Sequence, residues 1–286
     1  MKKKHLLGAF LSFLCTIIFF SCGNDDEKKI YPLSFEKKYY ERPLLRVTDI
    51  MIRGGNRDYT VTVEKTDILS INVDLSSPVG MGNLKVIPKK KGETKVSVRD
   101  NITNETVDLK IKITDSYLAY VIKESNHPAL SNGTAVYLIN NEAKDCYFFR
   151  YSDYKNELSQ TPIAKGTYDF SVKLENGSGN SSPTYPIPYL TLNYASDEQG
   201  NFTNASIPAT PHKLRFELYD GGTSVNAVIN LIQRYLSVDW EKLIQNAPTR
   251  SDHIIVPTLK TTIDNTDYTI IGILNTYPEI PENILE

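Results

Sequence analysis

The residue with the clearest chemistry in this 286-residue sequence is Cys22, a thiol that directly follows an apolar run. Residues 2–4 are lysines, and residues 6–20 are apolar over a stretch shorter than the ~20 residues that span a bilayer. Small Ser21 precedes the thiol, which is a nucleophile to which a diacylglycerol can be attached before the leader is cleaved. We therefore expect an export signal over residues 1–21 and a lipid anchor at Cys22.

In these features the first 29 residues resemble bacterial lipoprotein precursors. The alternative is an ordinary secretory signal cleaved near Ser21, in which Cys22 is an incidental thiol. Two or three acyl chains at Cys22 would hold the protein on a membrane far more firmly than one, because each buried methylene contributes ~0.8 kcal/mol. The resemblance implies that the chain is attached to a membrane through the lipid at Cys22.

Residues 22–29 are predicted to form a flexible tether, because a charged segment with little apolar content cannot fold alone. Within it, Asp25, Asp26 and Glu27 resemble the acidic export signal that sends Bacteroidetes lipoproteins to the outer face of the outer membrane. A solvated linker is the simpler interpretation, and both can hold. The resemblance implies a lipid-anchored protein of the outer membrane that is exposed at the cell surface.

Charge and cysteine content restrict the function classes. The formal net charge is −2, and removing the three lysines of the leader gives −2 − 3 = −5. Nucleic-acid binding requires a basic surface, so we expect no nucleic-acid partner. Cys15 leaves with the leader and Cys22 is acylated, so Cys146 has no disulfide partner and is predicted to be buried.

The histidines after the leader do not form a metal-binding motif. His127, His212 and His253 are scattered along the chain without metal-ligand spacing, and a site would require them to converge in space. We predict neither a metal nor a cofactor.

Acidic pairs offer equally little for catalysis. Asp197 with Glu198, and Asp264 with Asp267, lie in turn-like segments where carboxylates cap the backbone. A hydrolase would need two carboxylates about 5–10 Å apart in a cleft. The sequence also lacks nucleophile-elbow, phosphate-loop and dinucleotide motifs. We therefore predict that the chain is not an enzyme.

Tyrosine is abundant, at 18 residues, and its flat ring with a hydroxyl suits stacking on sugars and contact with proteins. Tyr185 and Tyr189 lie in a stretch, residues 176–189, whose composition predicts a long surface loop. With Tyr154 and Trp240 they are the candidate ligand-binding residues. The alternative is that tyrosine is simply a good strand residue.

Residues 30–114 are predicted to form one module of short antiparallel strands. Apolar residues alternate at period two in four runs, separated by turn segments rich in Gly, Asn and Asp. Gly92 is suited to the positive φ of a tight turn before one run. Residues 59–64, 67–71 and 90–100 resemble bacterial immunoglobulin-like modules of surface adhesins and exported lipoproteins. That resemblance implies a β-sandwich that serves as a spacer or contact surface and carries no catalytic residues.

Residues 115–286 are predicted to form a second β-rich domain of unrecognised family. Strand candidates recur along the whole stretch. They are residues 117–122, 135–139, 146–151, 167–172, 189–194, 213–219, 253–256 and 268–274. Helical spacing appears only near residues 224–246, where we expect a helix whose apolar stripe packs on a sheet face and a second short helix that buries Trp240.

The chain is thus predicted to be mainly β, with an immunoglobulin-like sandwich, a second β-rich domain and a short helical insertion. The leading functional hypothesis is a non-enzymatic surface lipoprotein that binds a glycan or another nutrient. The alternative is an adhesin, or a structural subunit of a surface protein assembly.

Overall fold

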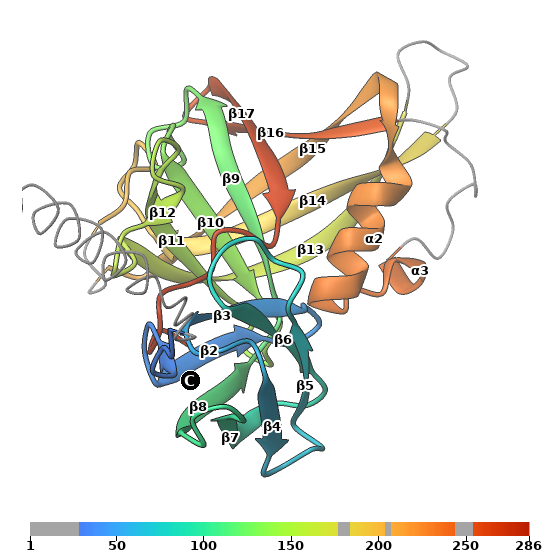
Figure 1. Cartoon of the computed structure of the whole chain (residues 1–286). Coiled ribbons are helices and arrows are strands. Elements are labelled where there is room, and N and C mark those ends of the chain that lie inside the picture. Colours follow the sequence, from blue (N-terminus) through green and yellow to red (C-terminus); the bar gives the residue numbers. More distant parts are fainter. Residues whose placement is uncertain (1–28, 177–183, 204–206, 244–253, 286) are drawn as a thin grey trace, which may run out of the picture.

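The computed structural model describes residues 29–176, 184–203, 207–243 and 254–285, which form two β domains (Figure 1). The first is a sandwich of two small sheets, and the second is an antiparallel barrel with a helical insertion. The prediction of a mainly β chain with an N-terminal sandwich and a second β-rich domain is confirmed.

The sandwich pairs two sheets of four strands each among the described residues. One sheet has the order β1 (Ser34–Phe35), β3 (Thr48–Gly54), β6 (Gly82–Pro88) and β5 (Leu69–Asp74). The other has the order β2 (Tyr39–Pro43), β8 (Thr106–Thr114), β7 (Gly92–Asp100) and β4 (Tyr59–Val63). The β2–β8 pair is parallel, and the other pairs are antiparallel.

The core of the sandwich follows the period-two pattern of the sequence. Val96 and Val98 of β7 are fully buried, whereas the intervening Ser97 points outward and bonds Asp108 of the neighbouring strand. Each fully buried aliphatic side chain stabilises the fold by ~1.5–3 kcal/mol. Gly92, at the start of β7, has φ +143°, so the predicted use of a positive φ is confirmed.

The second domain closes on itself. Its strands are β9 (Tyr117–Ser125), β10 (Thr134–Ile139), β11 (Asp145–Ser152), β12 (Glu157–Leu158), β13 (Ala164–Asn176), β14 (Thr184–Ala195), β15 (Ala209–Ser224), β16 (Ile254–Ile263) and β17 (Thr266–Asn275). Among the described residues they pair in the order β10-β9-β17-β16-β15-β14-β13-β11-β12, and β10 also pairs with β11. This last pairing closes eight of the strands into a barrel, and short β12 lies outside the ring. The sequence indicated the strands but not the closure.

The barrel interior is filled by side chains. Tyr120, Phe148, Tyr168, Phe170 and Tyr194 are among its buried residues, as expected for a barrel of this strand number. Helices α2 (Val225–Leu236) and α3 (Trp240–Leu243) pack against this core, so the predicted helical insertion is confirmed. The interior is therefore a packed core in the described part of the barrel.

The prediction of a continuous surface loop over residues 176–189 is wrong, because β14 already begins at Thr184. Pro186 and Pro188 obscured this strand, since proline supplies no N–H to a ladder and is confined to strand edges and bulges. β14 pairs with β13 along this stretch, but its register with β15 begins only at Tyr189. Both prolines thus lie where β14 is paired on one side alone.

Candidate functional site

The residues predicted to carry the anchor lie outside the described part of the chain. Cys22, Asp25, Asp26 and Glu27 belong to residues 1–28. The lipid anchor and the export signal therefore stay predictions.

The four predicted ligand-binding aromatics lie in different environments. Tyr154 is 97% exposed in the turn between β11 and β12, whereas Trp240 is 5% exposed in the barrel core. The Trp240 indole N–H donates to the carbonyl of Ile229 at 3.2 Å, and its ring packs edge-on against Phe170. A ligand could reach this indole only if α3 moved. The side chain of Tyr185 lies outside the described part, and Tyr189 is half-buried on the outer barrel wall.

Tyr189 lies within a cluster of charged side chains. Its hydroxyl donates to Glu175, which also forms an ion pair with Arg215 at 2.9 Å. The ammonium groups of Lys173 and Lys213 lie 5.4 and 4.6 Å from the centre of its ring. Burial and then the charge of Lys173 lower the pKa of Lys213. Two cations thus converge on one aromatic ring, an arrangement that an anion would stabilise.

A cleft of about 510 Å³ opens beside this cluster at one rim of the barrel. β15 pairs with β16 from Arg215 and Lys260 onward, with register shifts after Glu217. The preceding part of β15 and the end of β16 are not paired with each other. The cleft lies at this rim and is called the rim cleft below. Its lining residues are Ser196, Asp197, Glu198, Thr210, Pro211, His212, Lys213, Thr261, Thr262 and Ile263.

Ser196 and His212 form a buried pair in the rim cleft, with Oγ 2.8 Å from Nε2. Tyr194 stacks on the imidazole at 4.1 Å, and burial lowers the pKa of His212. A serine hydroxyl bonded to a neutral histidine is the contact that activates a nucleophile, but acyl transfer also needs an oxyanion hole. The nearby amides of Asp197 and Gly200 donate within their own loop. The pair therefore fits a structural role. Asp197 accepts from the amide of Asn201 at 2.8 Å, in agreement with the predicted backbone cap.

His127 approaches the same end of the barrel. Its Nδ1 accepts hydrogen bonds from the amides of Ala129 and Leu130, and burial, followed by the charge of His212, lowers its pKa to about 4. His253 lies outside the described residues. No group of three potential metal ligands occurs within the described part of the chain.

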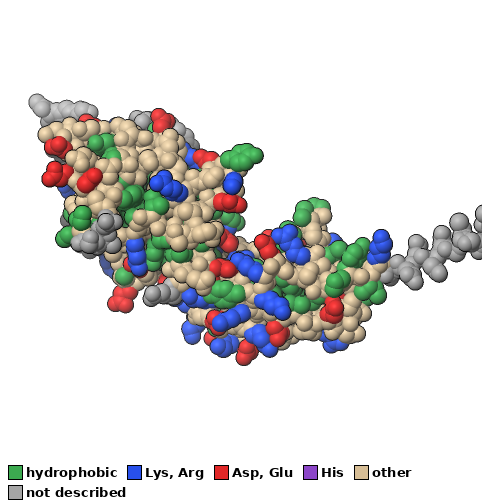
Figure 2. Space-filling view, turned by 90° about the vertical axis from the view of Figure 1, so that its left-hand side faces the viewer, with side chains coloured by type: hydrophobic (Ala, Val, Ile, Leu, Met, Phe, Trp, Pro, Cys, Tyr) green, Lys and Arg blue, Asp and Glu red, His purple; other side chains and the backbone are tan. Residues whose placement is uncertain are grey.

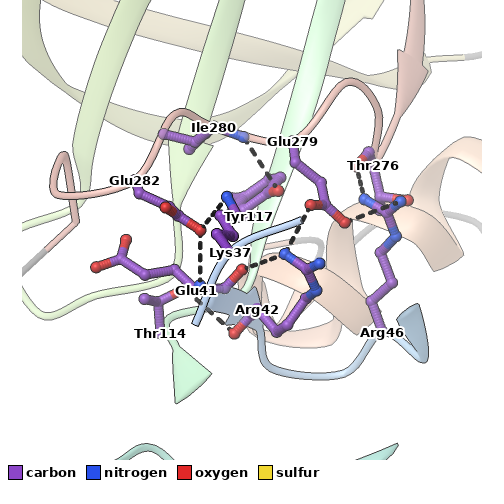
Figure 3. Close-up of polar contacts among 10 residues, drawn as sticks. All are labelled: Lys37, Glu41, Arg42, Arg46, Thr114, Tyr117, Thr276, Glu279, Ile280 and Glu282. Carbon is purple, nitrogen blue, oxygen red and sulfur yellow. Dashed lines mark hydrogen bonds and ion pairs between the residues drawn. The ribbon is translucent and has the colours of Figure 1, made fainter. Parts of the chain in front are cut away.

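The second polar site is the domain junction, where residues 276–285, the C-terminal segment, run between the sandwich and the barrel (Figure 3). Figure 3 shows the Glu279 carboxylate facing the guanidinium groups of Arg42 and Arg46. The ion-pair distances are 3.1 Å to Arg42 and 3.7 Å to Arg46. Arg46 is only 6% exposed, donates to the carbonyl of Thr276 and lies 3.2 Å from the centre of the Tyr277 ring.

Further polar contacts hold the end of the segment to the sandwich. Lys37 pairs with Glu282 at 2.5 Å, and the amide of Asn283 donates to Glu41 at 3.1 Å. The Lys112 ammonium donates to the carbonyl of Leu285 at 2.8 Å. The sandwich thus contacts the segment through β2, β8 and the residues that flank β2.

The opposite side of the C-terminal segment is apolar and packs on the outer face of β9, β10 and β11. Ile280, Ile284 and Leu285 pack with a cluster that includes buried Tyr117 and Tyr137. The Tyr137 hydroxyl donates to the carbonyl of Pro278 at 2.5 Å, and the amide of Ile280 donates to the Tyr117 hydroxyl at 3.4 Å. Burial raises the pKa of both tyrosine hydroxyls. The segment therefore joins both domains by contacts on its two sides.

Sequence reasoning missed the C-terminal segment. Its signal was present in Ile280, Ile284 and Leu285, apolar residues that follow the last strand and are interspersed with Glu279 and Glu282. β9 also indicated that an element covers the outer face of the barrel. Its residues 117–122 are apolar or aromatic at every position and hence buried on both faces.

Comparison with known proteins identifies no family. No protein-family model matches the chain, and no curated protein matches it. Among solved structures, domains 5–6 of the S-layer protein SbsC are 11% identical, with 65% of this chain and 97% of that chain covered and a TM-score of 0.25. Domains 4–9 of the same protein are 10% identical, with 83% and 37% covered and a TM-score of 0.25. A putative phosphatase from Bacteroides thetaiotaomicron is 12% identical, with 89% and 70% covered and a TM-score of 0.17.

The chain is thus distantly similar to domains of a bacterial surface protein, and similarity at this level carries no argument about function. None of the helices in the described part of the chain is long and apolar enough to cross a membrane.

Proposed function

We propose that the chain is a non-enzymatic lipoprotein, anchored to the outer membrane through Cys22 and exposed at the cell surface, that acts as an adhesin or a structural subunit of a surface assembly. The observation that carries this proposal is the domain junction. The C-terminal segment bonds the sandwich through Arg42 and Arg46 and packs on the barrel through Tyr137.

The junction supports a mechanical role because it opposes relative motion of the domains. Two domains of one chain move relative to each other by default unless their interface is large and well packed. Here β8 ends at Thr114 and β9 begins at Tyr117, so the connection is short. Ser116 in the connection donates to the carbonyl of Tyr235 in α2 at 2.8 Å. A rigid pair of this kind can hold the barrel at a fixed distance and orientation from the anchored end.

The test uses intact cells that produce the full chain. We expect the wild-type protein to be accessible to added protease, to fractionate with the outer membrane and to form covalent links with neighbouring surface proteins after chemical crosslinking. Cys22→Ala should release the protein from the membrane. A wild-type protein that is protected from protease, or that crosslinks to no other surface protein, would contradict the proposal.

A second candidate function is the binding of an acidic glycan at Tyr189. The observation that favours it is the convergence of Lys173 and Lys213 on the Tyr189 ring beside the rim cleft, where hydroxyl groups are abundant. A sugar carboxylate or sulfate would neutralise the two ammonium groups.

The second candidate is tested by titrating the purified protein with polygalacturonate and with a neutral polysaccharide. We expect binding of the acidic polymer alone, and Lys213→Ala should weaken it at least fivefold. Lys155→Ala, which removes a lysine from the exposed turn that carries Tyr154, is the matched control. Equal binding of both polymers would exclude this site.

A further inference from the structure

Five exposed apolar side chains gather at the end of the sandwich where the described chain begins. Ile30, Tyr31, Leu75, Val79 and Ile102 are between 38% and 62% exposed. They come from the first residues after the tether, the β5–β6 loop and the β7–β8 loop. We call them the tip patch.

Hydrogen bonds hold these separate loops together. Asn56, in the β3–β4 loop, accepts from the amide of Tyr31 at 3.0 Å and donates from its own amide to Asp100 at 2.7 Å. Asp100 in turn accepts from the amide of Ile102 at 2.9 Å. Arg57 donates to the carbonyl of Leu75, which adds the β5–β6 loop to the same end.

The strand directions place the tip patch at the end of the sandwich remote from the barrel. β8 leaves the β7–β8 loop at Thr106 and reaches the barrel connection at Thr114. Figure 2 shows the sandwich extending away from the barrel, with green apolar side chains near its far end. The apolar tips and the junction thus lie at opposite ends of one domain.

The acids on these loops are engaged locally. Asp58 accepts from the Asn101 side chain at 2.8 Å, and Asp74 accepts from the amide of Ser76 at 2.9 Å. Their carboxylates therefore stabilise the loops that carry the apolar residues.

The short tether indicates which surface covers the tip patch. Seven residues separate Cys22 from Ile30, so the end of the sandwich that carries Ile30 lies within about 30 Å of the acylated cysteine. Exposed apolar patches mark contacts with proteins or membranes, and a tyrosine suits the bilayer interface because one end of its side chain is apolar and the other polar. Since the tether begins at this same end, the nearest apolar phase is the bilayer that holds the lipid.

We propose that the tip patch lies in the interfacial layer of the membrane to which Cys22 is attached, so that the lipid and the loop tips fix the tilt of the sandwich together. The inference rests on the lipid anchor of the proposed function. With the rigid domain junction, it gives the whole chain a defined direction away from the membrane.

The experiment uses the full-length, processed protein purified from cells and reconstituted into phosphatidylcholine vesicles with or without brominated acyl chains. Tryptophan is introduced by Val79→Trp at the tip patch and, as the matched control, by Tyr154→Trp at an exposed turn of the barrel. Trp240 is buried and contributes the same background to both. We expect brominated lipid to quench at least half of the emission added by Val79→Trp and none of that added by Tyr154→Trp.

Vesicle flotation tests the lipid anchor separately from the membrane contact of the tip patch. Protein that floats but shows no quenching at Val79→Trp, or at Ile102→Trp as a second position, would overturn the inference and leave the lipid anchor intact. Protein that does not float would overturn the anchor and the inference with it. Emission shifted to the blue without quenching would mean that a second copy of the chain covers the patch, which also contradicts membrane contact.

Discussion

The domain junction and the rim cleft are both polar sites with buried titratable or charged groups, but they differ in the span of sequence that they connect. Arg46 at the junction contacts Thr276, 230 positions away. Ser196 and His212 at the rim are 16 positions apart, one just after β14 and the other in the neighbouring β15. The Ser196–His212 contact can therefore form in one hairpin, whereas the junction contacts require both domains to be folded and docked. We infer from this difference that the junction determines how the domains are arranged, whereas the rim determines only the local shape of its loops.

The largest expected effect is at the apolar side of the junction. Tyr137→Ala removes a fully buried ring and its hydrogen bond to Pro278, and should lower the free energy of unfolding by about 3–5 kcal/mol. Tyr154→Ala, at the 97% exposed tyrosine, should change it by less than about 0.5 kcal/mol. Denaturant unfolding of both variants measures the difference. Equal effects of the two substitutions would refute the role of the C-terminal segment as a packed element.

The next effect is at the rim and depends on pH. The pKa of His127 is about 4 in the folded chain and about 6.5 when unfolded, so between these values the unfolded chain binds the extra proton. Stability should therefore fall by up to about 3 kcal/mol as pH drops from 6.5 to 4.

His127→Asn is the matched variant, because its side-chain oxygen can accept the same two amide bonds but does not titrate. Unfolding measured from pH 4 to 7 should show a shallower loss of stability in this variant. An unchanged pH dependence would mean that another group titrates.

The polar side of the junction should give a smaller loss of stability. Arg46→Ala leaves Glu279 with Arg42 alone and removes the bond to Thr276, at a cost of about 1–3 kcal/mol. Arg53→Ala breaks a surface pair with Glu36, which should cost less than about 1 kcal/mol. Thermal unfolding measures both variants. A larger loss of stability in Arg53→Ala would show that the junction contributes less than an ordinary surface pair.

The smallest effect is expected at the rim pair. Ser196→Ala removes the partner of His212 Nε2 and should cost about 1 kcal/mol without altering the domain arrangement. Small-angle scattering of this variant should match that of the wild type, and an expanded particle would show that the rim also controls docking.

The strands could be predicted because their signal is local. In β7 and β8, period-two alternation places Val96, Val98 and Ile111 in the core from the sequence alone. The helix near residues 224–246 followed from its spacing in the same way. Barrel closure could not be predicted, because it requires the pairing of β9 with β17, the first and last strands of the ring, which no local pattern connects.

The candidate sites were less predictable for the same reason. The approach of His127 to His212, and of Arg46 to Glu279, joins residues that no local pattern connects. Trp240 was the aromatic least suited to its predicted ligand role, because the helix that carries it packs inward. Tyr189 is half-buried in β14, whose start at Thr184 was not predicted because of Pro186 and Pro188.

The central claim is that the junction makes the two domains one rigid unit, and a distance measured across it tests this most directly. Spin labels are attached through Asp67→Cys on the sandwich and Glu142→Cys on the barrel, both at exposed positions. Cys146 is buried, and burial raises the pKa of its thiol, so it does not take up label. We expect a single narrow distance distribution that broadens when Arg42→Ala and Arg46→Ala are combined. A broad distribution in the protein with an intact junction, unchanged by those substitutions, would contradict the account.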